Sequence, residues 1–565
     1  MGVYLNSKRP YLLYQEDYSL TYFVDKTEIL SELVPVLELR EPASVSSGQG
    51  QGKGYKYICI TRPRRFGKTV MANMIAAYFG KGVDSSDIFG NLKVASCRWY
   101  AKHLNTHNVI HIMFNEMPKN CKSYEKYIER IENRLLHDLM GAYPEAQIEE
   151  TDALWDAFNN IIEFGSEEKF IFVLDEWDFI YHQDFASGED KAAFTRFLSV
   201  LLKDQPYVEM VYMTGILPIA KYSSGSELNM FCEYTMVTEE KFSHCFGFTD
   251  KEVDALYARY QAQEAGSQKI TREELGRWYD GYHTMTGERV YNPRSVVLAL
   301  TNNNLGNYWT SSGPYDELFY YIGANVDEVR ADVGLMIADI PVPANVREYA
   351  ATSMELKTRD EIFSAMVVYG FLNYEKGCVS IPNKELMDKF ADMVQKEPSL
   401  GNVYRLTKES GRMLQATRAG DTETMAQILE FVHNTENPVG VYSNEAELAS
   451  VIKWAYLQAL DYYRIEREDK AGMGYVDYIF YPYKRDDDAI IIELKVNHSA
   501  QEAIRQIRER QYALRFEGKL GGKPEYTGRI LAVGIAYDKT DKNKRHTCQV
   551  EVLRERWTQE QENTR

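Results

Sequence analysis

Short hydrophobic runs alternate with amphipathic stretches through the first half of the chain. The runs at 57–61, 109–114, 170–174 and 208–213 are long enough for buried strands. Stretches with helical periodicity lie between them at 70–79, 123–139 and 191–202. Strands that alternate with helices predict an α/β domain with a parallel sheet covered by helices.

The pattern changes after residue 285. From 292 to about 438 it is mainly helical, except for two short strands at 370–374 and 378–381, which predict a winged-helix-like connector. A final α/β region follows, with a helix at 444–460, strands at 475–480 and 489–492, and a helix that begins at the capping box Ser499–Glu502. We therefore expect three domains, at 1–285, 286–438 and 439–565. A Ser/Gly/Gln-rich loop at 44–54 precedes the first strand.

Composition narrows the class of protein. The chain has 565 residues, of which 44% are hydrophobic and 13% aromatic, enough for several cores. It has neither an apolar run of eighteen residues nor a signal-peptide pattern, so we expect neither membrane insertion nor export. The seven cysteines are scattered without a Cys-x-x-Cys pair, which fits a reducing cytoplasm.

The net charge of −18 argues against a protein that passively coats DNA, so nucleic acid, if bound, would have to be held locally. Two basic clusters are candidates: Arg62, Arg64 and Arg65, and then Arg505, Arg508, Arg510, Arg515, Lys519 and Lys523. The second cluster can equally be a solvated helix face.

A candidate phosphate-binding loop joins the first predicted strand to its helix, with the sequence Arg62-Pro63-Arg64-Arg65-Phe66-Gly67-Lys68-Thr69. Backbone N–H groups at a helix N-terminus can cradle phosphates, while Lys68 reaches the β- and γ-oxygens and Thr69 holds Mg²⁺. Arg62 replaces the first glycine of the usual pattern, so the loop must turn differently. We predict that ATP and Mg²⁺ bind here, with Arg64, Arg65 and Gly67 also contacting nucleotide.

Acidic residues follow the run 170–174. Asp175 is expected to hold Mg²⁺ through water, Glu176 to polarise the attacking water, and Asp178 to position its neighbours. The run 208–213 ends in Thr214-Gly215, so Thr214 is predicted to present a polar group toward the γ-phosphate.

A second candidate site lies in the last region. Asp477 stands within one predicted strand, and the next strand continues into Glu493-Leu494-Lys495, where charge is costly without a partner. Two carboxylates on Mg²⁺ with a lysine beside them can cleave a phosphodiester. Gln506 shares a face of the following helix with Glu502 and can face this site. We predict Asp477, Glu493, Lys495 and Gln506 as nuclease residues.

Several segments resemble one known family. Gly474–Asp477, Ile490–Lys495 and 503–512 are similar to the PD-(D/E)XK nuclease domain appended to the AAA-ATPase-like family of prokaryotes, whose phosphate loop also resembles 62–69. Further similar segments are 22–27, 246–250, 278–283 and 290–296, so the resemblance spans nearly the whole chain.

The resemblance implies that an acid of the upstream helix is a further metal ligand. Glu445 is preferred over Glu447 by helical face, although spacing does not decide between them. Arg294 can be a sensor arginine or part of a surface salt bridge. The aromatic segment 278–283 can be lid packing or a nucleotide contact.

We interpret the chain as an ATPase whose nucleotide state controls a Mg²⁺-dependent nuclease. The resemblance implies a role in defence against foreign DNA or in processing mobile elements, and a homo-oligomer is compatible with it. The choice between DNA and RNA stays open. The alternative is a nucleotide-dependent switch that binds a partner, with weak hydrolysis and a nuclease-like domain that does not cleave.

Overall fold

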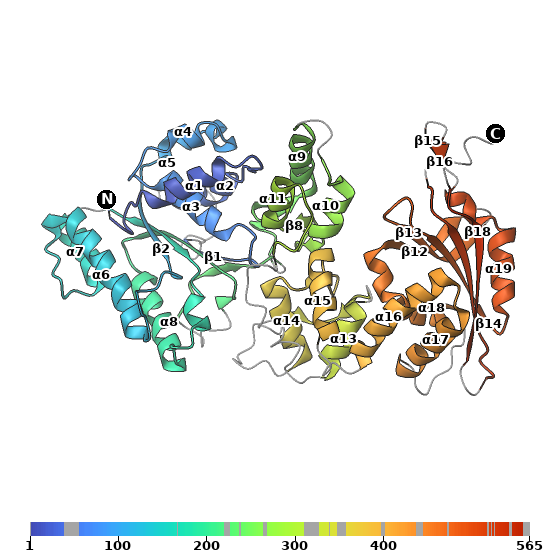
Figure 1. The fold of residues 1–565 in the computed structure, drawn as a ribbon. Helices are drawn as coiled ribbons and strands as arrows, with labels where there is room; N and C mark the ends of the chain where they lie inside the picture. The colour runs from blue at the N-terminus through green and yellow to red at the C-terminus, as the bar shows by residue number, and fades with distance from the viewer. Residues whose placement is uncertain are drawn as a thin grey trace, which may run out of the picture. The chain divides into compact units, whose positions relative to one another are not determined.

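The computed structural model describes residues 2–38, 56–165, 168–219, 227–236, 239–263, 268–309, 327–337, 340–346, 358–396, 402–436, 445–471, 474–516, 519–520, 523–524, 526–541 and 545–557. The chain divides into two compact units (Figure 1): Met1–Val329 with Pro341–Met387, and Arg330–Ile340 with Asp388–Arg565. The expected three-domain boundaries stay a prediction, since this division falls near Met387. The expected loop at 44–54 lies outside the described residues.

A five-stranded sheet organises the first unit, in the order β2-β3-β4-β1-β5, and every neighbouring pair is parallel. The predicted parallel α/β sheet is thus confirmed. Its strands are β1 (Tyr57–Thr61), β2 (Asn108–Met113), β3 (Phe170–Asp175), β4 (Val208–Gly215) and β5 (Cys232–Tyr234). Because β4 lies between β1 and β3, the phosphate loop and the acidic segment flank the end of β4.

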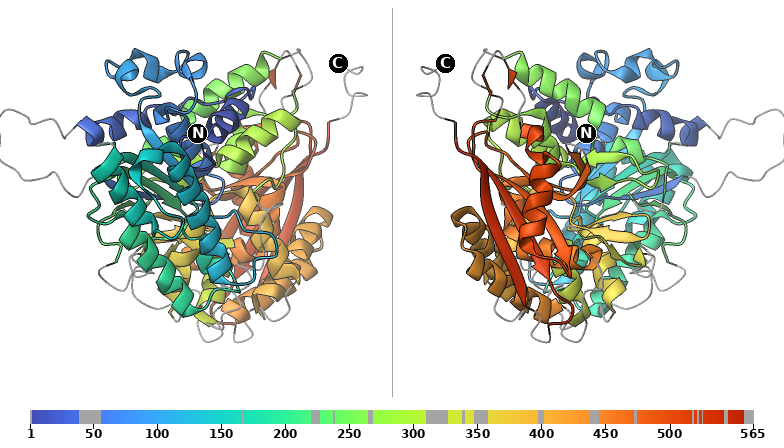
Figure 2. Two further views of the ribbon diagram at one scale, coloured as in Figure 1. Left: turned by 90° about the vertical axis from the view of Figure 1, so that its left-hand side faces the viewer. Right: turned by 90° about the vertical axis from the view of Figure 1, so that its right-hand side faces the viewer.

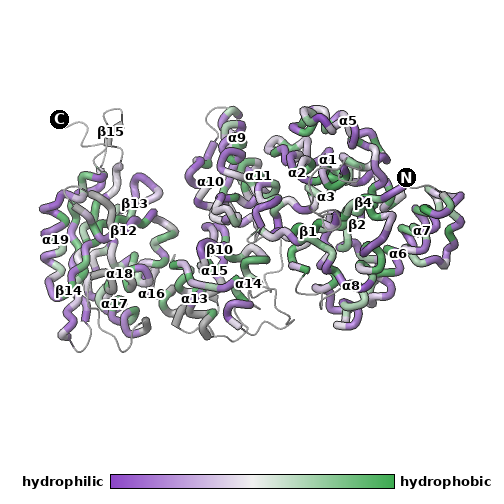
Figure 3. The backbone as a smooth tube through the Cα atoms, turned by 180° about the vertical axis from the view of Figure 1, so that it is seen from behind, coloured by the Kyte–Doolittle hydropathy of each residue, from purple (hydrophilic) through white to green (hydrophobic). Residues whose placement is uncertain are grey.

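Successive strand residues enter two different cores, as the period of two requires. Tyr57 and Cys59 join the core on one face, whereas Ile58 and Ile60 join the core on the other. The helices that supply the first core are α6 (Tyr124–Ala142), α7 (Leu154–Asn160) and α8 (Gly188–Leu202). Those that supply the second are α1 (Arg9–Tyr18), α2 (Ile29–Glu38), α3 (Lys68–Phe79) and α4 (Ser86–Phe89). In Figure 3, hydrophobic and hydrophilic colours alternate along α6 and α8, as expected of helices with one buried face.

A smaller part of the first unit follows the sheet in sequence and has its own core around Val253, Leu275 and Val296. Its elements are β6 (Phe248–Thr249), α9 (Asp250–Gln261), α10 (Arg272–Tyr279), β7 (Tyr282–His283), β8 (Arg289–Tyr291) and α11 (Pro293–Asn302). Next come β9 (Val342–Pro343), α14 (Arg359–Tyr369), β10 (Asn373–Glu375) and β11 (Cys378–Ser380), where β11 pairs with both β9 and β10. The hairpin expected within 370–381 is therefore present and follows a helix, although its first strand begins at Asn373 and not at residue 370.

The second unit contains a mixed sheet in the order β12-β13-β14-β17-β18, in which only β14 and β17 are parallel among the paired strands described. Its strands are β12 (Tyr463–Ala471), β13 (Gly474–Pro482), β14 (Ala489–Val496), β17 (Ile530–Tyr537) and β18 (His546–Arg554). The short β15 (Lys519–Leu520) and β16 (Lys523–Pro524) pair with each other. Helices lie on both sides of the large sheet (Figure 2, right). They include α16 (Asn402–Ala419), α17 (Thr422–Glu436), α18 (Glu445–Ala455) and α19 (Ala500–Glu509).

Two helices continue from one unit into the other along the chain: α13 (Asp327–Ile337) and α15 (Lys384–Lys396). The cysteines are all free thiols. Among the described helices, none is both long enough and apolar enough to cross a membrane.

Candidate functional site

The candidate phosphate loop connects the end of β1 to the start of α3, as predicted. Gly67 precedes the helix with a φ of 86°, a conformation that favours glycine, and Arg65 also has a positive φ of 72°. No atom lies within 4 Å of the position that a Cβ on Gly67 would occupy, so conformation and not crowding selects glycine there. The first N–H groups of an α-helix have no acceptor within the helix, so those of α3 are candidates to bind phosphate.

Lys68 is buried against its own loop. Its Nζ donates to the carbonyl oxygens of Arg62 and Pro63, both at 2.8 Å. Burial lowers the pKa of Lys68 to about 8, although the charges of Asp178, Asp175 and Glu176 oppose this shift. A negatively charged ligand could therefore replace the two neutral carbonyl oxygens as the partner of the Lys68 ammonium.

Asp175 and Thr214 face each other across β3 and β4. Both are fully buried, and neither Asp175 Oδ2 nor Thr214 Oγ1 has a hydrogen-bond partner in the described part of the chain. Burial raises the pKa of Asp175 to about 7, and a hydrogen bond from Thr69 acts in the opposite direction. Buried polar atoms left in this state are costly. A hydrated Mg²⁺ would satisfy both, so the residues fit the predicted ion.

Glu176 has a positive φ of 53°. Burial and the nearby Asp178 raise its pKa, while Lys68 and a hydrogen bond with Asn115 lower it. Asn115, which follows β2, was not predicted as a site residue, because no local sequence signal distinguishes it.

Asp178 has a positioning role within the fold. Its Oδ2 accepts hydrogen bonds from the N–H groups of Ile216 and Leu217, at 3.0 and 2.8 Å. Burial opposes ionisation, yet contacts with His182 and these backbone donors keep the pKa of Asp178 below its usual value. The carboxylate thus fixes the chain beyond Thr214, and its role toward the neighbouring acids stays a prediction.

The structure corrects one predicted contact. Arg62 is 1% exposed, so it cannot belong to a surface patch for nucleic acid. Its guanidinium donates to the carbonyl oxygens of Thr61, Tyr234 and Phe242, and it stacks over the ring of Phe246. The arginine that replaces the usual glycine is therefore an internal brace of the loop.

Residues distant in sequence cover the phosphate loop. The Phe66 ring packs edge-on against Tyr282 at 5.1 Å, and Gly370 lies so close to Pro63 that a Cβ would come within 2.6 Å. Tyr282 of the segment 278–283 therefore packs on the loop, and a nucleotide contact of this segment stays a prediction. Burial lowers the pKa of Arg65, and the charges of Arg294 and Arg64 lower it further, which places Arg294 near the loop.

A buried carboxylate connects these covering elements. Glu385, at the start of α15, accepts hydrogen bonds from the Ser295 hydroxyl and from the N–H of Trp309. The Trp309 indole in turn donates to the carbonyl oxygen of Arg64 at 3.0 Å. Glu385 is 1% exposed. One chain of hydrogen bonds therefore runs from the phosphate loop to the helix that continues into the second unit.

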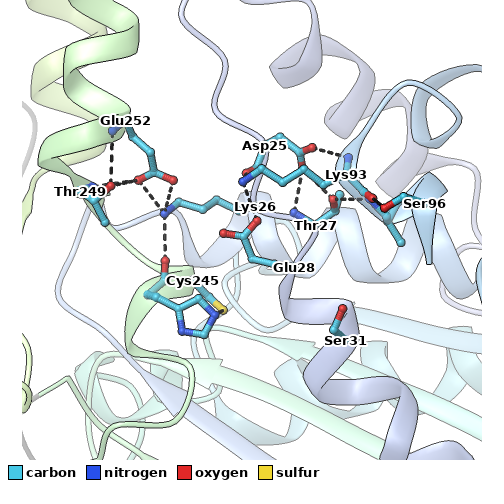
Figure 4. A network of polar contacts seen from close by, with 12 residues as sticks. Asp25, Lys26, Thr27, Glu28, Ser31, Lys93, Ser96, Cys245, Thr249 and Glu252 are labelled. Carbon is cyan, nitrogen blue, oxygen red and sulfur yellow. Dashed lines mark hydrogen bonds and ion pairs between the residues drawn. The ribbon is translucent and has the colours of Figure 1, made fainter. Parts of the chain in front are cut away.

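Residues 25–28 join neighbouring segments of the first unit through polar contacts (Figure 4). Lys26 Nζ donates to the carbonyl oxygen of His244 at 2.9 Å and pairs with Glu252, which caps α9. Asp25 accepts from the N–H of Lys93. The Lys26 contacts fasten the start of α9 to the segment before α2, and the Asp25 contact fastens the same segment to Lys93.

The second candidate site lies where β13 and β14 separate. The last paired residues are Tyr478 and Ile492, so Asp477 and Glu493 come next on both strands and share one face of the sheet. Asp477 Oδ2 accepts from the N–H of Leu494 at 2.7 Å, in place of a ladder hydrogen bond. The two predicted acids are therefore neighbours.

Glu493 is buried at 3% exposure. Its Oε1 accepts from Lys495 Nζ at 3.1 Å and from the Gln506 amide. The predicted residues Glu493, Lys495 and Gln506 thus form one hydrogen-bonded group. Sequence reasoning did not assign a role to Tyr512, which lies beside Gln506 and Glu493 and donates to the carbonyl oxygen of Tyr475 at 2.6 Å.

The two facing carboxylates are hard oxygen donors, which fits Mg²⁺, an ion commonly bound through one or two carboxylates and several waters. Among the described side chains, no group of three or more His, Cys, Asp or Glu is placed to hold a metal. The side chains of Glu445 and Glu447 lie outside the described residues, so the choice between them stays a prediction.

The second basic cluster is partly engaged in ion pairs. Arg508 pairs with Glu551, and Arg505 lies 3.8 Å from Glu509. These two arginines thus resemble a solvated helix face. Lys519 and Lys523 have no described side chains.

Comparison with known proteins defines the class of each part. Residues 51–224 match the family model described as predicted AAA-ATPase, and residues 443–546 match that of the PD-(D/E)XK nuclease superfamily. The chain therefore combines a predicted AAA-ATPase domain with a C-terminal PD-(D/E)XK nuclease superfamily domain, as the sequence motifs indicated.

Three individual proteins that resemble the chain are distant from it in sequence. An uncharacterized protein in the vnfD 5'region of Azotobacter chroococcum mcd 1 is 24% identical over 297 residues, and the match covers 52% of this chain and 51% of the relative. The chain thus spans about half the length of that curated relative. A Walker-type ATPase of Pyrococcus abyssi covers 63% of this chain and 99% of its own, with 13% identity and a TM-score of 0.31. The ORC2 protein of Aeropyrum pernix covers 66% and 97%, with 11% identity and a TM-score of 0.23.

Proposed function

We propose that the chain binds and hydrolyses ATP in its first unit and that nucleotide state controls metal-dependent cleavage of nucleic acid in its second. The ATPase half of the proposal is supported by the pair Asp175 and Thr214, whose buried oxygens have no hydrogen-bond partner among the described residues and lie near Lys68. Lys68 would hold the β- and γ-phosphates, Thr69 and Asp175 the hydrated Mg²⁺, and Glu176 the attacking water.

The group formed by Asp477, Glu493, Lys495 and Gln506 supports the second half. Mg²⁺, when bound, supplies an activated water and neutralises charge on the phosphate. Asp477 and Glu493 would hold the ion, Gln506 would fix the orientation of Glu493, and Lys495 would orient the water or stabilise the reacting phosphate. The contacts of Glu493 with Lys495 and Gln506 support this grouping.

We propose that coupling uses hydrogen bonds that lead from the phosphate loop to α15. The hydrogen bonds from Arg64 through Trp309 to Glu385 end on α15, whose residues from Asp388 onward belong to the second unit. A change in the loop on nucleotide binding would thus reach that helix. We further propose a cytoplasmic location and a role against foreign or mobile DNA, consistent with a nuclease held inactive until a nucleotide signal arrives.

The test is nuclease activity with Mg²⁺ or Mn²⁺, with and without ATP, on single- and double-stranded DNA and RNA. Glu176→Gln should retain ATP affinity but slow hydrolysis, and it should shift cleavage if the sites are coupled. Cleavage identical in both nucleotide states would rule out coupling. Nucleotide-dependent binding without cleavage under any metal condition would favour the switch over the nuclease.

A further inference from the structure

Two histidines at the C-terminal end of α3 form a continuous chain of polar contacts between two glutamates. His103 Nε2 lies 3.2 Å from Glu38 Oε1, and His107 Nδ1 lies 3.1 Å from Glu209 Oε2. The remaining ring nitrogens, His103 Nδ1 and His107 Nε2, face each other at 2.9 Å. We call these four side chains the histidine bridge. They belong to neither candidate site, so the proposed function does not explain them.

The two imidazole rings meet end to end. Their planes differ by 11°, and their centres are 5.2 Å apart. Rings stacked face to face at that separation could not bring two nitrogens to 2.9 Å, whereas rings in one plane with the nitrogens pointing at each other do. The contact is therefore an in-line N–H···N hydrogen bond. Such a bond needs a proton on one inner nitrogen and a lone pair on the other.

The outer contacts fix the number of protons on the histidine bridge. Hydrogen bonds with His103 and Lys102 keep the pKa of Glu38 below its ordinary value, so Glu38 is a carboxylate and His103 must donate to it. His107 must likewise donate to the carboxylate of Glu209. With the inner hydrogen bond, the two rings need three protons, whereas two neutral imidazoles carry two. The rings therefore share one extra proton and one positive charge.

The histidine bridge cannot accept a second extra proton and stay closed. Both inner nitrogens would then carry hydrogen, and two cations would face each other. His103 is 4% exposed, and burial lowers its pKa; the charges of His107 and Lys102 act in the same direction, and Glu38 opposes them. Because the folded-state pKa of His103 is lowered, the stability that this group contributes is present above its ordinary value of 6.5 and is lost as the pH falls below it.

The histidine bridge lies where α2 and α5 (Tyr100–His103) end and where β4 begins. The N–H of His107 donates at 2.9 Å to the carbonyl oxygen of Phe79, the last residue of α3. A positive charge is favourable at a helix C-terminus, where carbonyl groups carry partial negative charge. The opposite end of α3 carries Lys68, about 17 Å away at a rise of 1.5 Å per residue, and the opposite end of β4 carries Thr214. Both elements thus join the histidine bridge to the candidate nucleotide site.

We propose that the histidine bridge is an acid-sensitive joint: with one extra proton it fastens the end of α3 to α2 and β4, and a second proton opens it and weakens nucleotide binding. The charged groups described around the two rings are Glu38 of α2, Lys102 of α5 and Glu209 of β4, while α3 contributes the Phe79 ring. The inference goes beyond the proposed function, because protonation of the histidine bridge can be measured without nucleotide or nucleic acid.

The first measurement locates the shared proton in the full chain. In histidine-labelled protein at pH 7.5, long-range ¹H–¹⁵N spectra should show one N–H proton coupled to nitrogens of two different rings. This signal should be absent from His103→Gln and His107→Gln. Two neutral rings without a shared proton in the wild type would overturn the proposal, even if both variants failed to fold.

The second measurement follows opening of the joint by amide hydrogen exchange, corrected for the intrinsic effect of pH. The N–H groups of Asn105 and His107 donate to the last turn of α3. In the wild type their protection should fall roughly 10-fold between pH 7.5 and pH 5. In His107→Gln it should stay constant, because an amide can donate to a neutral His103 and accept from a protonated one.

His498→Gln is the matched control, since His498 also contacts one carboxylate, that of Glu502 at 2.9 Å, but is exposed and lies in the second unit. It should respond to acid as the wild type does. Constant protection of the wild type between pH 7.5 and pH 5, or an equal loss in His107→Gln, would overturn the joint.

The third measurement compares ATP affinity, because Asp175 and Lys68 titrate in the wild type and in His107→Gln alike. Between pH 7.5 and pH 5 the affinity of the wild type should fall by roughly fivefold more than that of the variant. Equal falls would overturn the link between the histidine bridge and nucleotide binding. A wild type that binds no ATP at any pH would instead overturn the proposed ATPase, and the shared proton would still be measurable.

Discussion

Asp175 and Thr214 lie opposite each other on neighbouring parallel strands, and each has a buried oxygen that no described residue satisfies. Native proteins seldom keep two such atoms together without a ligand or ordered water between them. The pair is therefore a costly feature of the fold, which function explains better than stability does.

Asp175→Asn should stabilise the protein while removing ATP hydrolysis. At pH 8 the wild-type carboxylate is ionised and buried. The neutral amide of Asn in the variant should therefore raise the free energy of unfolding by roughly 1–3 kcal/mol. Burial raises the pKa of Asp175 to about 7, so the folded state favours the protonated carboxyl group. The stability that this preference contributes is complete below pH 3.8, the ordinary pKa of the group, and is lost as the pH rises through about 7. Thermal unfolding between pH 5 and pH 8 should show this slope in the wild type and a weaker one in the variant.

We expect the Lys68 amine to take up a proton when nucleotide binds. Burial lowers its pKa to about 8, and phosphate charge would raise it again. At pH 8.5, ATP without metal should therefore bind with uptake of a fraction of a proton, and its affinity should fall as the pH rises further. Calorimetry in two buffers of different ionisation enthalpy measures this. Lys68→Ala should lose most affinity, and unchanged binding in that variant would contradict the phosphate-loop assignment.

Arg62→Gly restores the glycine of the usual pattern yet should harm this protein. The change removes hydrogen bonds to three carbonyl groups and leaves a cavity beside Phe246. We expect a loss of about 2–4 kcal/mol in the free energy of unfolding, together with weaker ATP binding. Arg62→Met keeps the aliphatic stem, so its free energy of unfolding should lie between those of the wild type and the glycine variant. A glycine variant as stable as the wild type would show that the brace is dispensable.

Much of the fold follows from local patterns, since the strands around Lys68 and Asp175 are hydrophobic runs bounded by polar residues. The proximity of Asp477 and Glu493 was predictable for the same reason, because two strands joined by a turn bring their acids together. The burial of Arg62 and the role of Glu385 were not predictable. Their partners lie far away in sequence, as with Arg62 and Phe242 or Glu385 and Ser295, and no local spacing encodes such contacts.

At position 385 we expect the protein to keep its stability with a glutamine but not with an apolar residue. In Glu385→Gln the amide oxygen can still accept from Trp309, and the amide group can donate to a rotated Ser295 hydroxyl. In Glu385→Leu both donors lose their acceptor, at a cost of about 2–4 kcal/mol. Weaker support for Trp309 should then raise the KM for ATP. Thermal unfolding and ATPase kinetics of the two variants check this, and equal effects of Gln and Leu would exclude the hydrogen-bond explanation.

The acids of the second site should act as one unit. Asp477→Ala and Glu493→Ala should each reduce metal-dependent cleavage by more than roughly 100-fold, and the double variant should be hardly worse, because either change disrupts the same ion site. Mn²⁺ affinity, measured by calorimetry, should fall in both acid variants. In Lys495→Ala it should persist, since an ammonium is no ligand. ATP hydrolysis should continue in all of them, because these residues lie in a separate compact unit from Lys68 and Asp175. If the two acid defects multiplied in the double variant, or if Lys495→Ala lost Mn²⁺ as the acid variants do, the shared ion site would be wrong.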